Sequence, residues 1–175
     1  MIKGQCDPRF KKIKDIFSNS LGSGFETGAA LAIEYKGEVI VNLWGGHQDS
    51  NKNLEWEENT LINVFSVTKG ITAICVSKLI DQGKLDHNQK VSYYWPEYGC
   101  NGKEDTIVSD FLCHRAGMFG FQNGMPKGSW QNWQNFVSHL EAQTPYSMPA
   151  TSQGYHALTY GWLVGELFSR VDGRT

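Results

Sequence analysis

The strand pattern of this chain ends early, and this limits the folds it can adopt more than any other feature. Two β-rich runs, residues 29–35 and 38–44, flank the short turn Lys36-Gly37 and predict a β-hairpin. After residue 60 the sequence shows helical patterns and loops, without a further strand-like run. Because two strands alone make an unstable sheet, we expect this hairpin to need additional strands. The pattern predicts an α+β fold of which this chain carries only a part.

Helical patterns account for most of the remaining residues. Asp7 and Pro8 predict the start of a first helix that ends near Gly22. A long helix is predicted from Ser66 to about Gly83, where Cys75 is expected to be a small core side chain; the residues at 3.6-residue spacing are Ile71, Ile74, Cys75, Leu79 and Gln82. Three further helices are expected over residues 106–114, 129–142 and 158–171.

Composition and charge exclude several classes of function. The 175 residues include 16 Lys and Arg and 18 Asp and Glu, for a formal net charge of −2, so the charge does not favour nucleic acid as a partner. No apolar run reaches the ~18 residues that cross a bilayer, and the N-terminus lacks the apolar segment of a secretion signal. Four cysteines without a CxxC spacing favour reduced thiols. These features favour a cytoplasmic protein, while a leader removed before residue 1 stays open.

Ser66-Val67-Thr68-Lys69 is the one S-x-x-K sequence in the chain. Residues three apart on a helix share a face, so the Lys69 amine can reach the Ser66 hydroxyl. A serine hydroxyl becomes a good nucleophile when a neighbouring base takes its proton, and a helix N-terminus adds positive potential for a developing oxyanion. A capping serine followed by a surface lysine would give the same short pattern. Its position between a strand-like run and an amphipathic helix favours the catalytic interpretation.

Four motifs in the same order strengthen that interpretation. Residues 65–70 (FSVTKG) resemble the nucleophile motif of the serine β-lactamase-related family, which contains class C β-lactamases, DD-peptidases and family VIII carboxylesterases. Residues 79–86 (LIDQGKLD) resemble the segment after the nucleophile helix, and residues 112–118 (LCHRAGM) resemble the L-x-H-x-x-G turn. Residues 155–163 resemble the region of the second catalytic motif. The resemblance covers nearly the whole chain and implies a β-lactamase/DD-peptidase-like fold, an antiparallel sheet flanked by helices plus a helical region.

The resemblance implies a role for each matching residue. Ser66 would be the nucleophile, Lys69 its base partner and Tyr155 a second base or acid, with the first proton acceptor left open between Lys69 and Tyr155. For that role the tyrosine pKa, ordinarily about 10, must be lowered by a nearby cation such as Lys69. The Ser66 backbone N–H and one N–H from a later strand would form the oxyanion hole. His156 is expected to line the substrate pocket, and His114 is expected to be structural.

Two departures from the family pattern refine the expected function. Position 157 is Ala, where lactamases and peptidases carry an Asn that helps to hold a substrate amide. Ala157 is therefore assigned to the substrate-binding site and favours ester hydrolysis. The late K-T-G strand motif is absent, so the C-terminal sheet strands, one oxyanion N–H and part of the groove would be missing. We expect an N-terminal fragment, a split chain or a truncated product, completed by a C-terminal segment or a second polypeptide.

The sequence thus predicts a serine hydrolase that forms an acyl-enzyme, most strongly a carboxylesterase acting on small esters. A β-lactamase or DD-peptidase-like enzyme is the alternative within this class, and an inactive or truncated relative that acts as a binding module is the alternative from another class. The expected partner is a small-molecule ester or β-lactam, with no nucleic acid, membrane, metal or cofactor. Residues 1–175 are predicted to be the N-terminal part of one β-lactamase-like domain, with a helix and hairpin over 1–60 and a mostly helical part over 61–175.

Overall fold

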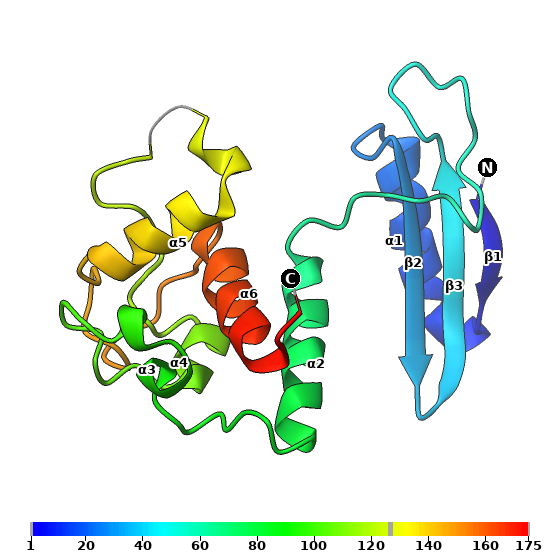
Figure 1. The fold of residues 1–175 in the computed structure, drawn as a ribbon. Coiled ribbons are helices and arrows are strands. Elements are labelled where there is room, and N and C mark those ends of the chain that lie inside the picture. The colour runs from blue at the N-terminus through cyan, green and yellow to red at the C-terminus, as the bar shows by residue number, and fades with distance from the viewer. Residues whose placement is uncertain (1, 126–127, 175) are drawn as a thin grey trace. The chain divides into compact units, whose positions relative to one another are not determined.

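The computed structural model describes residues 2–125 and 128–174 of the chain (Figure 1). The chain forms two compact units, residues 1–63 and residues 64–175. Each unit has its own cluster of buried apolar side chains. Within the described residues, the helices are all too short or too polar to cross a bilayer.

The first unit is a three-stranded antiparallel sheet with a helix against it. The strands are β1 (Ile2–Cys6), β2 (Gly28–Tyr35) and β3 (Glu38–Gly46), paired in the order β1-β3-β2. The 3-10 turn η1 (Pro8–Phe10) leads into α1 (Lys11–Gly22), which lies along the sheet (Figure 1). Asp7 caps η1 by accepting a hydrogen bond from the Arg9 amide at 2.8 Å, as predicted for this helix start. The small core is formed by Ile40, Val41 and Leu43, with Phe10, Phe17, Leu31 and Ile33 packed against it.

The predicted hairpin is confirmed, and one strand was missed. Lys36 and Gly37 have φ values of 53° and 82°, which a two-residue type I′ turn requires. Strand β1 was not predicted because a glycine interrupts its five residues, and glycine weakens a strand pattern. At Gly4, φ is 101° and a Cβ would lie 2.0 Å from the Asn42 carbonyl oxygen. Glycine therefore permits the close approach of β1 to β3.

The second unit is built from helices and the loops between them. They are α2 (Val67–Asp81), α3 (Val91–Tyr94), η2 (Pro96–Tyr98), α4 (Val108–Leu112), η3 (Ser129–Gln131), α5 (Trp133–Ala142) and α6 (Thr159–Asp172). Helices α2 and α6 lie side by side (Figure 1). The core of this unit contains Val76, Leu79, Trp95, Phe111, Leu163 and Leu167. The predicted helices all occur, with bounds that differ by a few residues.

Helix α2 is apolar on more than one side. Val76 and Leu79 are buried in the core of the unit. Ile71 and Ile74 are 58% and 66% exposed, and Cys75 is also exposed, so the core position predicted for Cys75 is wrong. The 3.6-residue spacing identifies an apolar stripe, but it cannot tell which apolar side meets the core. All four cysteines are free thiols, as predicted.

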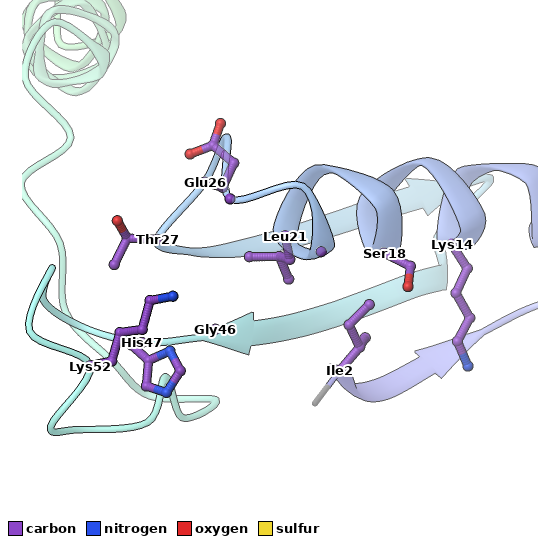
Figure 2. Close-up of a pocket in the computed structure, with 11 residues that line it drawn as sticks. Ile2, Lys14, Ser18, Leu21, Glu26, Thr27, Gly46, His47 and Lys52 are labelled. Carbon is purple, nitrogen blue, oxygen red and sulfur yellow. The ribbon is translucent and has the colours of Figure 1, made fainter.

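A pocket of about 430 Å³ lies in the first unit, between α1 and the end of β3. Figure 2 shows Lys14, Ser18 and Leu21 pointing from α1 towards the space beside Ile2, with His47 also on its wall. Lys14 and Ser18 are exposed. The pocket includes none of the predicted site residues, which all belong to the second unit.

Candidate active site

Ser66 lies at the N-cap position of α2, but its hydroxyl makes no capping hydrogen bond to the helix. The Lys69 Nζ, one turn further on, donates to the Ser66 Oγ at 3.2 Å. Phe65, directly before the serine, has φ of 44°, in the left-handed region that a non-glycine residue seldom adopts. Such strain persists where the surrounding structure over-determines it, and it is concentrated at functional sites. The serine hydroxyl is thus presented to the lysine instead of being used as a cap.

The start of α2 also limits which backbone amide could bind an oxyanion. The amides of Val67, Thr68 and Lys69 donate to the carbonyls of Val64, Phe65 and Ser66, at 3.0–3.1 Å. These three amides are therefore committed to the first turn. The Ser66 N–H, the donor that the resemblance implies, is not one of these three.

The structure brings Tyr155 to the same place from a loop that precedes α6. The Lys69 Nζ lies 5.1 Å from the centre of the Tyr155 ring and donates to the Ala157 carbonyl oxygen at 2.9 Å. A hydrogen bond with the Ser66 hydroxyl lowers the pKa of Tyr155, and the hydrogen bond and charge of Lys69 lower it further. Tyr155 is 55% exposed, so its ring is accessible from solvent. The three predicted catalytic side chains therefore form one cluster.

His156 points away from this accessible surface. Its ring is fully buried, and its Nε2 accepts a hydrogen bond from the Met118 amide at 3.0 Å. The proton is consequently on Nδ1, which donates to the Gly154 carbonyl at 2.6 Å. Burial lowers the pKa of His156 to about 4. Both ring nitrogens are occupied, so this arrangement does not offer the ring to a substrate, contrary to our expectation that it lines the pocket.

The L-x-H-x-x-G segment packs against the chain that leads to Tyr155. Gly117 has φ of 70°, and a Cβ there would lie 2.0 Å from the Ser147 carbonyl oxygen. The Gly117 carbonyl accepts from the Tyr146 amide at 2.8 Å, and the Arg115 carbonyl accepts from the Ala150 amide at 3.0 Å. Gly117 thus allows the backbone of residues 115–117 to pack directly against that of residues 146–150, which lead to Tyr155.

Sequence reasoning missed two contributions to this cluster. Ala157 was chosen for its side chain, whereas its backbone oxygen is the group that holds the Lys69 amine. His114 was expected to serve only the turn, but its ring centre lies 4.7 Å from that of Tyr155. A backbone acceptor leaves no signal in a sequence. His114 was noticed within the L-x-H-x-x-G turn, but no local pattern linked it to Tyr155. In the described ranges, no three or more His, Cys, Asp or Glu residues gather in a way that could hold a metal ion.

A small antiparallel sheet with a helix against it, followed by a helical unit that begins with the serine helix, defines a β-lactamase/DD-peptidase-like protein. The family model described as Beta-lactamase matches residues 13–175, and the chain belongs to this family. The resemblance found in the sequence and the predicted fold class are both confirmed.

Named relatives agree with the assignment. The chain is 34% identical to the esterase/beta-lactamase LipL of Mycobacterium tuberculosis over 178 residues, which cover 99% of this chain and 40% of that protein. Among solved structures, a family VIII carboxylesterase is 39% identical with a TM-score of 0.88, and a penicillin-binding protein homolog from Caulobacter crescentus is 37% identical with a TM-score of 0.92. Both matches cover 100% of this chain and 47% of the other. The chain thus spans less than half the length of these relatives.

Proposed function

We propose that this chain carries the nucleophile and both proton-transfer groups of a serine hydrolase, and that its substrates are small carboxylic esters. The observation that carries the proposal is the convergence on the Ser66 hydroxyl of the Lys69 amine, at 3.2 Å, and the Tyr155 phenol. A serine hydroxyl needs such a base within hydrogen-bond reach before it attacks a carbonyl carbon.

The arrangement supports a two-step acyl transfer. In the first step Lys69 or Tyr155 takes the Ser66 proton while Oγ forms a bond to the ester carbonyl carbon. The tetrahedral intermediate then collapses, the bond to the alcohol oxygen breaks, and the departing alkoxide takes a proton from the same pair. In the second step water attacks the acyl carbon and gives up a proton to that pair. The bond between this carbon and Oγ then breaks, Oγ takes the proton from the pair, and the carboxylic acid leaves. The lowered pKa of Tyr155 supports its part in these transfers.

Ala157 supports esters over β-lactams. A short methyl side chain at this position offers no hydrogen bond to a substrate amide, and an ester of a simple acid has no such amide. The relatives include both an esterase/beta-lactamase and a carboxylesterase. Since the chain spans less than half of each, we propose that a C-terminal segment or a second polypeptide supplies the rest of the substrate groove and one oxyanion N–H.

Covalent labelling tests the nucleophile directly. The complete polypeptide that carries residues 1–175 is treated with a fluorophosphonate, and the adduct is located by peptide mass spectrometry. We expect one adduct, on Ser66, and none in the Ser66→Ala variant. Ser77→Ala is the matched control, because Ser77 is an exposed serine on the same helix whose hydroxyl donates to the Ala73 carbonyl oxygen. Labelling that persists in Ser66→Ala would refute the assignment.

Substrate class is tested by turnover. We expect nitrophenyl acetate or butyrate to be hydrolysed faster than nitrocefin. In an Ala157→Asn variant, the ratio of ester turnover to nitrocefin turnover should be smaller. The reverse preference would favour the β-lactamase alternative. A folded polypeptide that neither labels nor turns over either substrate would favour a binding module.

A further inference from the structure

The ring of His114 lies against the ring of Tyr155, the candidate catalytic tyrosine, and its backbone adopts a positive φ. Its φ is 59°, in the left-handed region, where histidine, asparagine and aspartate are the side chains found most often after glycine. This conformation ends α4 and turns the imidazole towards the loop that carries Tyr155. The centres of the two rings are 4.7 Å apart, and a second tyrosine, Tyr160 on α6, lies 5.2 Å from the histidine ring.

His114 also holds the backbone of the tyrosine loop. Its Nδ1 accepts a hydrogen bond from the His156 amide at 3.1 Å, and its carbonyl oxygen accepts from the Gly154 amide at 3.0 Å. His156 completes this clamp from the other side through its own bonds to Gly154 and Met118. The residues before and after Tyr155 are therefore both anchored, and the phenol has little freedom to leave Ser66.

The position of the proton on His114 matters to this clamp. Because Nδ1 accepts from a backbone amide, the clamp requires that Nδ1 carries no proton. Burial and, less strongly, the positive charge of Lys69 lower the pKa of His114, which favours that form. The titratable groups that face its ring are Lys69 from α2, Tyr155 and His156 from the loop, and Tyr160 from α6.

We propose that His114 is a positioning residue for Tyr155: its ring supports the phenol, and its Nδ1 fixes the following peptide, so that the phenol stays on the Ser66 hydroxyl. The inference rests on the proposed function and adds a residue that acts through the tyrosine. A displacement of about 1 Å of a reacting group can reduce a rate about 100-fold, so such a support has a measurable effect.

His114→Asn is the informative variant. Asparagine tolerates the left-handed backbone, and its Oδ1 can accept the His156 amide as Nδ1 does, while the ring against Tyr155 is lost. We expect ester kcat to fall about 10-fold to 100-fold with KM changed less than about threefold. His87→Asn, at an exposed histidine, is the control and should match the wild type. If His114→Asn does not fold, His114→Gly suits the same backbone, and its loss should be larger because the acceptor is also removed.

A double-mutant cycle separates positioning from a general structural role. In a Tyr155→Phe background the His114→Asn change should have little further effect, because the group that it positions is already inactive. An equal fold-loss in both backgrounds, or wild-type activity of His114→Asn, would overturn the proposal. A titration of tyrosinate absorbance gives a readout without turnover: the pKa of Tyr155 should move back towards its ordinary value in His114→Asn. If the wild type proves inert, the proposed function fails, and an unchanged titration would still refute the positioning role.

Discussion

Replacing Gly117 with alanine tests whether the close contact between Gly117 and the Ser147 carbonyl stabilises the segment that leads to Tyr155. Two costs combine at this position. An L-residue in the left-handed region loses about 1–2 kcal/mol. The new Cβ would also lie 2.0 Å from the Ser147 carbonyl oxygen, and making room for an extra methyl in a packed region costs about 1–3 kcal/mol more. We therefore expect Gly117→Ala to lower the free energy of unfolding by about 2–5 kcal/mol.

Gly83→Ala provides the matched control. Its φ is 68° against 70° at Gly117, but nothing lies within 4 Å of the Cβ that would be added. Only the backbone strain applies, so the expected loss is about 1–2 kcal/mol. The difference between the two variants isolates the contact with the segment that leads to Tyr155.

Urea unfolding followed by tryptophan fluorescence and circular dichroism measures both losses, and fluorophosphonate labelling measures the effect on Ser66. Gly117→Ala should label more slowly than Gly83→Ala in buffer without urea, where both remain folded. Equal losses of stability in the two variants would refute the reasoning, because the steric contact would then contribute nothing.

Three further measurements address the site and the core. The lowered pKa of Tyr155 predicts that kcat/KM rises with pH through a midpoint below 10. Tyr155→Phe should abolish this rise and reduce kcat/KM about 100-fold or more. A rise with pH that persists in Tyr155→Phe would show that another group causes it. Burial lowers the pKa of Lys103, so unfolding takes up a proton between that pKa and 10.5, and stability should rise with pH across this window. In Lys103→Met the urea midpoint should rise less with pH than in the wild type. An equal rise in both proteins would show that another group causes it. Leu163 is 1% exposed, and Leu163→Ala should lower the free energy of unfolding by about 2–5 kcal/mol by urea titration, a smaller loss indicating that the core closes around the gap.

Local chemistry explains why much of the fold was predictable. The hairpin was identified from a turn whose two residues accept positive φ, and the helix starts and ends were identified from Asp7, Pro8 and Gly83. Strand β1 was not, because Gly4 interrupts its short pattern, although the same glycine lets it approach β3. The sequence of a strand does not show which strand it pairs with.

The candidate site divides in the same way. The three-residue spacing placed Ser66 and Lys69 together through helix geometry alone. Tyr155 could be assigned only through resemblance, since no local pattern joins residues so far apart in the sequence. For His156, its place next to Tyr155 in the sequence suggested a pocket residue, yet the Met118 and Gly154 backbone groups satisfy its ring inside the unit.

The strand order β1-β3-β2 has a practical consequence for handling the protein. Since β3 is central, β1 and β2 each have an outer edge that, within residues 2–125 and 128–174, pairs with no further strand. Such an edge displays unsatisfied backbone donors and acceptors that can recruit a strand from another molecule. Between Ile33 and Glu34 a register shift distorts one of these edges, and the positive φ at Gly4 distorts the other. Such irregularities discourage edge-to-edge pairing between molecules, so the two outer strands carry their own protection against aggregation.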